Sequence, residues 1–255
     1  LTDLDIRRLA RQQKQFDDLK CIVAVGSSGI VNTCRNKFLF AEYLDKRGIP
    51  VIPTQELAAF QANPYYPCFA KPLSGSSSIG ASKIETPAQL LRHVEAYGEE
   101  LILQPFIEGQ EFTIDIYKSR AGDVKAIVPR QRLRVRAGEI EQGITVDDPD
   151  LLAAARQLAE ALEGLWGVFC AQCRRTPDGQ ILFYEVNPRF GGGAPQSIAA
   201  GANIPLYLLE DIMGLEITTD GSFQADLLMM RYPAAFFKTT HQPSALDGYN
   251  GPISR

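Results

Sequence analysis

The stretch Gly167-Val-Phe-Cys-Ala-Gln-Cys-Arg-Arg-Thr-Pro-Asp-Gly-Gln-Ile-Leu-Phe-Tyr-Glu-Val-Asn187 contains two alternating apolar runs joined by Asp178-Gly179. Asp-Gly between such runs is the strongest short-range signal of a β-hairpin. If Asp178 and Gly179 form a two-residue loop, Gln172 lies directly opposite Glu185, and Asn187 shares the face of Glu185. The hairpin therefore predicts three oxygen-bearing side chains close together at one end of two strands.

These three side chains indicate a site for a hard cation. Mg²⁺ takes carboxylate and amide oxygens as ligands and completes its shell with phosphate oxygens and water. The alternative is an exposed polar face of the hairpin. Apolar neighbours such as Val168 and Cys170 favour a buried sheet, where a carboxylate and two amides would be costly without a ligand.

A loop of small residues, Ser74–Gly80, separates the predicted strands Tyr66–Pro72 and Ala81–Ile84. Gly75 and Gly80 have Walker A spacing, but no Lys-Ser/Thr pair follows, so a P-loop is excluded. Backbone N–H groups of such a loop can cover phosphates as a moving lid. A plain surface turn is the alternative, and Lys71 beside the loop favours a phosphate site.

Four arginines, at positions 130, 132, 134 and 136, alternate with other residues, so a strand would line them along one face. Guanidinium groups bind carboxylates and phosphates in bidentate fashion. An edge strand kept in solution by its charges is the alternative.

Composition excludes several classes of protein. The chain has 26 Lys and Arg residues against 30 Asp and Glu residues, so no basic field attracts nucleic acid or an anionic membrane. The apolar runs are well short of the roughly 20 residues of a membrane span. Five scattered cysteines do not form a disulfide framework, and two thiols three residues apart in a strand point to opposite faces. We expect a cytoplasmic protein without nucleic-acid or membrane partners.

The remaining elements are predicted from periodicity and end signals. Helices are expected over 1–20, 36–47, 87–98 and 149–164. Strands are expected over 21–25, 100–104, 111–117, 124–128, 130–136 and 227–231.

An ordered series of motifs resembles the ATP-grasp family. The series comprises Asn36-Lys37 opening a helix, Phe69-Ala-Lys71-Pro72, Gln104-Pro-Phe-Ile-Glu-Gly-Gln-Glu111-Phe-Thr-Ile-Asp115, Gln172, and Glu185-Val-Asn187-Pro-Arg189. It is most similar to the synthetase domains of the carbamoyl-phosphate synthase large chain and to stand-alone carbamoyl-phosphate synthase-like proteins. The resemblance covers about residues 20 to 215.

This resemblance implies an α+β fold in which two subdomains clamp ATP. Residues 1–36 would be a remnant of a preceding α/β domain, residues 37–104 the N-terminal and lid subdomain, and residues 105–255 the C-terminal subdomain.

The resemblance also implies roles for individual residues. Nucleotide contacts are expected from Lys37, Lys71, Ser76, Ser77, Ser78, Gln104, Pro105, Phe106, Ile107 and Glu111, the last accepting the ribose hydroxyls. Mg²⁺, or Mn²⁺, would be held by Gln172, Glu185 and Asn187. Catalytic roles are expected for Arg189, Lys71 and Glu185, with Arg189 steadying the transferred phosphoryl group. An anionic substrate would be bound by Arg130, Arg134 and Arg136.

The function implied is an ADP-forming ligase that activates a carboxylate as an acyl phosphate for attack by an amine. Two alternatives remain open: a small-molecule kinase with the same site, and a nucleotide-binding subunit without turnover. The expected partners are small-molecule carboxylates and amines, and a homodimer is compatible with the sequence.

Overall fold

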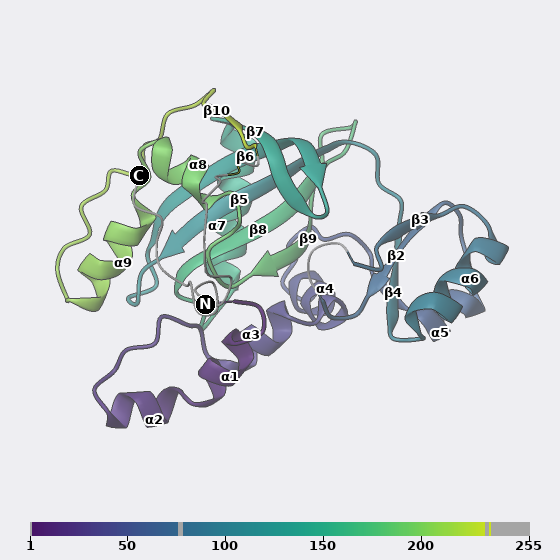
Figure 1. Cartoon of the computed structure of the whole chain (residues 1–255), viewed down its shortest axis with the longest axis horizontal. Helices are drawn as coiled ribbons and strands as arrows, with labels where there is room; N and C mark the ends of the chain where they lie inside the picture. The colour runs from purple at the N-terminus through teal and green to yellow at the C-terminus, as the bar shows by residue number, and fades with distance from the viewer. Residues whose placement is uncertain (1, 76–78, 233–234, 236–255) are drawn as a thin grey trace, which may run out of the picture.

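The computed structural model describes residues 2–75, 79–232 and 235, and these form two antiparallel sheets with helices packed on them. The larger sheet occupies the centre of Figure 1 and the smaller sheet lies on the right. The larger sheet has the order β10-β7-β6-β5-β8-β9, and the smaller one has the order β1-β4-β2-β3. The mixture of helices and antiparallel strands confirms the predicted α+β class.

The strands are β1 (Gln55–Glu56), β2 (Cys68–Pro72), β3 (Ser82–Ile84), β4 (Leu101–Pro105), β5 (Gln110–Lys118), β6 (Val124–Arg136), β7 (Glu139–Thr145), β8 (Gly167–Arg175), β9 (Ile181–Asn187) and β10 (Leu228–Met230). The helices are α1 (Ile6–Arg11), α2 (Gln13–Asp18), α3 (Ser28–Cys34), α4 (Lys37–Asp45), α5 (Leu57–Ala62), α6 (Pro87–Tyr97), α7 (Pro149–Ala161), α8 (Ala194–Ala199) and α9 (Ile204–Ile212).

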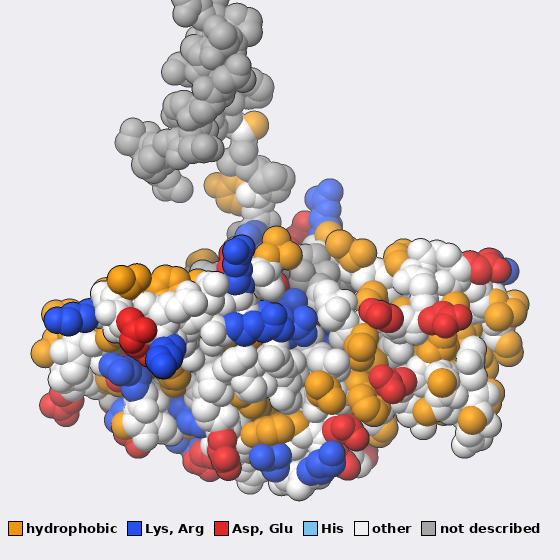
Figure 2. Space-filling view, turned by 90° about the horizontal axis from the view of Figure 1, so that it is seen from below, with side chains coloured by type: hydrophobic (Ala, Val, Ile, Leu, Met, Phe, Trp, Pro, Cys, Tyr) orange, Lys and Arg blue, Asp and Glu red, His pale blue; other side chains and the backbone are white. Residues whose placement is uncertain are grey.

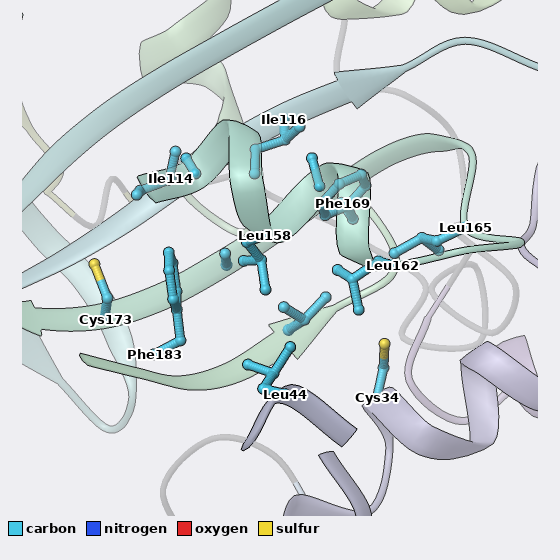
Figure 3. Packing of buried hydrophobic residues seen from close by; sticks show 14 of the residues in the cluster. Cys34, Leu44, Ile114, Ile116, Leu158, Leu162, Leu165, Phe169, Cys173 and Phe183 are labelled. Atoms are coloured by element: carbon cyan, nitrogen blue, oxygen red, sulfur yellow. The ribbon is translucent and has the colours of Figure 1, made fainter. Parts of the chain in front are cut away.

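One face of the larger sheet packs on α3, α4 and α7 and forms the main core. Figure 3 shows this core, in which Leu44 of α4 and Leu158 of α7 lie with Ile114 and Phe169 of the sheet. The opposite face packs partly on α9, where Tyr117 of β5 contacts Tyr207, and the Ser197 hydroxyl of α8 donates to Asp115 of β5. Strand alternation assigns each side chain to one of these two faces.

Strand β5 shows how this alternation positions the site. Its even-numbered residues from Phe112 to Ile116 are buried in the main core. The odd-numbered residues Glu111, Thr113 and Asp115 face the other side, where Glu111 and Thr113 line pockets. Packing of the apolar side chains of β5 therefore fixes where its polar side chains lie and which way they point.

The β8–β9 hairpin has Gln172 directly opposite Glu185, as predicted, but its loop length and strand pairing differ from the prediction. Thr176 and Gln180 close a three-residue loop, since the Thr176 N–H donates to the Gln180 carbonyl at 2.9 Å. Gly179 has φ +90°, as in a type I turn followed by a left-handed residue. Pairing then skips Tyr184, because Cys173 pairs with Phe183 and Gln172 pairs with Glu185. This bulge cancels the one-residue shift that the longer loop introduces.

The bulge changes which side chains face the site. Phe183 and Val186 are buried in the main core, whereas Tyr184 and Glu185 both line a pocket on the opposite face. Two successive side chains point the same way because the extra residue breaks the strict alternation.

Several sequence predictions about elements were wrong. Cys21–Val25 pairs with no strand among the described residues, and the segment after it, Ser28–Cys34, is a helix. The predicted helix over 1–20 is divided at Gln12 into α1 and α2. The two predicted strands 124–128 and 130–136 form one strand, β6. Pro129 has no N–H to donate, but its carbonyl accepts from the Val146 N–H at 2.9 Å, so the proline does not interrupt the strand. Strand β7 was not predicted.

Helix α4 packs on β9 and contributes Phe40 and Leu44 to the core of the larger sheet. Residues 50–52 also follow the edge of this sheet, since the Ile52 N–H donates to the Phe183 carbonyl at 2.9 Å. The first part of the predicted 37–104 subdomain thus packs with the larger sheet, whereas residues 55–105 build the smaller one. The predicted boundaries at 36/37 and 104/105 stay predictions.

Asp148 joins helix α7 to the hairpin and offers a test of the fold. Its carboxylate accepts from the Asp150 and Leu151 N–H groups as N-cap and pairs with both terminal nitrogens of Arg175 at 2.6 and 2.7 Å. We expect Asp148→Ala to lower the free energy of unfolding by about 2 kcal/mol, about half from the cap and half from the partly exposed ion pair. Asp148→Asn, which keeps a capping oxygen, should lose only the ion-pair part.

The same pair predicts a pH dependence. Hydrogen bonding to Arg175 lowers the pKa of Asp148 below its usual value, so the ionised form stabilises the fold. This contribution is complete above the unfolded-state pKa near 4 and is lost as the pH falls through the lower folded-state value. Urea unfolding of wild type and Asp148→Asn should therefore give curves whose difference shrinks on acidification. A difference that is constant from pH 7 to pH 2 would contradict the assignment.

Candidate functional site

A pocket of about 260 Å³ lies between the two sheets. The smaller sheet contributes Phe69 and Lys71, and Gln104–Ile107 connect it to β5 at the back of the pocket. The larger sheet contributes Glu111, Gln172, Tyr184 and Glu185, and the first residue of α4, Lys37, closes one side. The structure therefore brings together all the described residues predicted to contact a nucleotide.

The segment 104–107 has a buried polar residue and an aromatic one. The Gln104 amide is 3% exposed and donates to the Thr54 hydroxyl at 2.8 Å, which fixes the side chain away from solvent. Phe106 lies 6.5 Å from Phe69 between ring centroids, and the two rings give the pocket an apolar wall. An apolar slot with backbone groups at its edge is typical of sites for flat heteroaromatic rings.

Two lysines place positive charge at the inner end of the pocket. Burial lowers the pKa of Lys71 to about 8, although Glu185 opposes this shift and outweighs the smaller repulsion from Lys37. Burial also lowers the pKa of Lys37, whose Nζ donates to the Pro72 carbonyl at 3.3 Å. Asn36 fixes Lys37 at the helix start, because its side chain accepts from the Phe38 and Leu39 N–H groups. Buried ammonium groups with so few acceptors favour an anionic ligand.

Glu111 already has protein partners on both carboxylate oxygens. The Tyr184 hydroxyl donates to Oε1 at 2.7 Å, Arg132 Nε lies 3.0 Å from Oε1, and Arg174 donates to Oε2 at 3.1 Å. The carboxylate still lines the pocket, so its predicted ribose contact remains geometrically open but would share these oxygens.

A second pocket of about 370 Å³ adjoins the first. Both pockets are lined by Arg132, Gly138, Gln172 and Glu185, which therefore form the junction between them. The second pocket is rich in guanidinium groups and backbone: Arg130, Arg189 and the Gly191–Gly193 run line it. Lys37 and Lys71 thus lie on one side of the Gln172–Glu185 pair, and the arginines of the second pocket lie on the other.

The predicted metal ligands meet at this junction. Gln172 and Glu185 line both pockets, and Asn187 lines the second. Asn187 Nδ2 donates to Glu185 Oε1 at 2.8 Å, and Asn187 Oδ1 accepts from Arg35 at 3.4 Å. Among the described residues no three His, Cys, Asp or Glu side chains are grouped as metal ligands. Glu185 with the amide of Gln172 fits a cation that obtains its other ligands from phosphate and water, whereas the amide oxygen of Asn187 accepts from Arg35 and its nitrogen faces Glu185.

Arg189 has a partner that the sequence did not reveal. Its guanidinium holds Asp3, near the start of the chain, with Nε 2.7 Å from Oδ1 and Nη2 bonded to Oδ2. Arg35 approaches the same carboxylate at 3.0 Å. Burial alone would raise the pKa of Asp3, but Arg189 and Arg35 outweigh it and hold that pKa below its usual value.

The prediction that four arginines of β6 share one face was wrong. Pairing of β6 with β7 shifts on both sides of Arg134, which breaks the alternation. The side-chain exposures are 1% for Arg130, 8% for Arg132, 66% for Arg134 and 77% for Arg136. Arg134 and Arg136 lie beside Glu141 outside both pockets, whereas Arg132 lines both.

Arg130 is buried at the wall of the second pocket. Its Nε donates to Asp115 Oδ2 at 3.0 Å, and the Ser197 hydroxyl donates to the same oxygen at 2.6 Å. Its Nη1 is buried without a partner among the described residues. Gly193 lies against this guanidinium, where any Cβ would collide with Nη1.

Some predicted residues lie outside the description, and some described ones were missed. Ser76, Ser77 and Ser78 fall outside the described residues. Arg35, Arg174 and Tyr184 were not predicted as site residues, and Arg132 was named only as one of the four arginines of the predicted strand. The alternation rule could have found Arg174, two residues after Gln172, whereas Tyr184 depends on the bulge.

Figure 2 shows one face of the molecule, where a group of Lys and Arg side chains lies near the middle, and other charged and hydrophobic side chains are spread to the left, to the right and below. Within residues 2–75, 79–232 and 235, no helix combines the length and apolar character needed to cross a membrane.

Known proteins share both sequence and fold with this chain. The family model for ATP-grasp in the biosynthetic pathway with Ter operon matches residues 98–232, and the model for the D-Ala–D-Ala ligase C-terminus matches residues 41–138. D-Alanine–D-alanine ligase of Streptococcus pneumoniae strain P1031 is 26% identical over 179 residues. This match covers 60% of the chain and 51% of the relative, so the chain spans about half the length of the curated relatives it matches.

Solved structures share the fold at low sequence identity. Biotin carboxylase from Campylobacter jejuni, in complex with an ATP analogue, has a TM-score of 0.74 and 15% identity over 89% of this chain and 56% of its own. N5-carboxyaminoimidazole ribonucleotide synthetase from Thermotoga maritima has a TM-score of 0.63 and 21% identity over 82% and 57%. L-Amino acid ligase from Bacillus licheniformis has a TM-score of 0.62 and 21% identity over 81% and 54%. With a family model matching more than half of its residues, the chain belongs to the ATP-grasp family.

Proposed function

We propose that the chain is an ATP- and Mg²⁺-dependent ligase, which phosphorylates a carboxylate and couples the acyl phosphate to an amine with release of ADP and phosphate. The curated relatives are ligases, and structural neighbours are described with bound ADP, MgADP or an ATP analogue. The proposal includes that its substrates are of the kind used by carbamoyl-phosphate synthase-like proteins.

The observation that carries the proposal is the pair of pockets that meet at Gln172 and Glu185. The first pocket combines an apolar wall with the buried Lys71 and the partly buried Lys37, as a nucleotide base and its phosphates require. The second pocket presents guanidinium groups to a small anion. A phosphoryl group leaving the first pocket would therefore meet an acceptor in the second at the junction.

The polar and charged side chains of the two pockets have separate tasks in this proposal. Glu185 and Gln172 would hold Mg²⁺, which neutralises phosphate charge during transfer. Lys71 and Lys37 would bind the phosphates, and Arg189 would steady the transferred group. The attacking group is a carboxylate that is already an anion, so this step needs no general base. A positioned array of cations is the main source of catalysis in phosphoryl transfer.

The amine requirement separates this proposal from a small-molecule kinase. A ligase releases ADP and inorganic phosphate together with an amide, and its steady turnover depends on the amine. A kinase accumulates a phosphorylated product without any amine. We expect ADP release against panels of carboxylates and amines to show a pair that is required jointly. Turnover by one compound alone, with a stable phosphorylated product, would favour the kinase.

Glu185→Gln tests the metal role. Glu185 is the one carboxylate among the three predicted metal ligands, so its loss should lower ATP turnover by about 100-fold or more. The melting temperature should change little, because the amide keeps the hydrogen bond from Asn187. Asp178→Asn, an exposed carboxylate of the same hairpin, is the matched control and should retain full turnover. Equal turnover in the two variants would contradict the metal assignment.

Lys71 gives the pocket a distinctive pH dependence. The pKa of the free ammonium is about 8, and a bound triphosphate would raise it, so binding should take up a proton between pH 8 and 9. We expect the dissociation constant of a non-hydrolysable ATP analogue with Mg²⁺ to rise about fivefold from pH 8 to pH 9, because the protonated fraction of free Lys71 falls from about a half to about a tenth. Calorimetry in buffers of different ionisation enthalpy measures the proton directly.

Lys71→Arg is the control for this measurement. A guanidinium stays charged across the range, so the variant should bind with a much flatter pH profile. Identical pH profiles for wild type and Lys71→Arg would show that another group titrates.

A further inference from the structure

The N-terminal segment presents one side chain to the second pocket. In residues 2–5, Thr2, Leu4 and Asp5 are exposed, and Leu4 is 91% exposed. Asp3 alone points inward, where it is 11% exposed and lines the pocket with Thr2. The apolar anchor of the segment comes later, at Ile6, which is fully buried with Ala10.

Asp3 occupies a binding site made for a carboxylate. Arg189 meets both oxygens of Asp3, and Arg35 approaches one of them at 3.0 Å. A bidentate guanidinium with a second guanidinium beside it matches the geometry of carboxylate recognition. The two arginines are themselves largely buried, with side chains 20% and 10% exposed.

This binding site is connected to the predicted chemistry. Arg35 and Arg189 both approach Asn187 Oδ1, at 3.4 and 3.5 Å. Asn187 in turn donates to Glu185. The carboxylate of Asp3 therefore lies two side chains from the junction of the two pockets.

We propose that Asp3 is an internal competitor for the substrate carboxylate, and that Arg35 together with Arg189 forms the subsite that this carboxylate takes over. The proposal rests on the proposed function for the identity of the substrate group. Replacing Asp3 by a free carboxylate keeps the net charge around the two guanidiniums unchanged. It breaks no apolar packing, because no apolar side chain of residues 2–5 is buried. Asp3 then raises the apparent dissociation constant of the substrate carboxylate, because only the molecules in which Asp3 has left the subsite can bind it.

The test measures binding of a simple carboxylate without turnover. Acetate is titrated into the whole chain in the presence of Mg²⁺ and a non-hydrolysable ATP analogue, and its dissociation constant is measured by NMR line broadening of ¹³C-acetate. Asp3→Asn should bind acetate about tenfold more tightly than wild type, as expected if Asp3 leaves the subsite open in a tenth of the molecules. Asp5→Asn changes a neighbouring exposed carboxylate and should bind acetate like wild type.

A second variant assigns the subsite. Arg35→Ala in the Asp3→Asn background should remove the gain in acetate affinity, while the affinity for the ATP analogue stays the same. Equal acetate affinity in wild type and Asp3→Asn would show that the two arginines do not take up a free carboxylate when Asp3 is neutralised, which would overturn the proposal. The readout does not need turnover, so the ligase proposal can fail in the ADP assay while acetate still competes with Asp3.

Discussion

The register of the β8–β9 hairpin is the constraint on which the site depends. Phe183 and Val186 must face the main core, and Gln172 must lie opposite Glu185. Regular alternation cannot place Phe183 in the core and Glu185 toward the pockets, because residues two apart share a face. The extra residue at Tyr184 resolves the conflict, and core packing on both sides holds it in place. The bulge also gives Tyr184 its contact with Glu111, so one irregularity shapes both ends of the first pocket.

Charge is distributed around this hairpin in a way that a stable core alone would not favour. Lys71 is buried with a pKa of about 8, and Arg130 is 1% exposed with one nitrogen unpartnered among the described residues. Burying cations with incomplete pairing costs several kcal/mol, which a bound anion would offset. Two carboxylates of the pockets, Glu111 and Asp3, each have more than one guanidinium partner, whereas Asp115 pairs with Arg130. The cleft is therefore arranged for ligands that bring negative charge, as a nucleotide and a carboxylate do.

The alternation of two apolar runs and the Asp178-Gly179 turn signal predicted the hairpin and its polar residues Gln172, Glu185 and Asn187, whereas the nucleotide contacts were predicted from the resemblance to the ATP-grasp family. The pairing of Gln172 with Glu185 was predicted from a two-residue loop, whereas in the structure it results from a three-residue loop and a compensating bulge. Alternation failed at Arg134, where the pairing with β7 shifts. The contact between Asp3 and Arg189 joins residues 186 positions apart and has no local signal. Long-range ion pairs and bulges are fixed by tertiary packing, so they are the parts that a single sequence leaves open.

The central claim is that the two pockets pass a phosphoryl group to a carboxylate at the junction formed by Gln172 and Glu185. Formation of an acyl phosphate joins a carboxylate oxygen to phosphorus, and amine attack then expels that oxygen with the phosphate. Turnover of a carboxylate labelled with ¹⁸O, with mass spectrometry of the inorganic phosphate, measures this transfer directly. The account predicts one ¹⁸O atom in each phosphate released. Unlabelled phosphate formed together with the amide would contradict it.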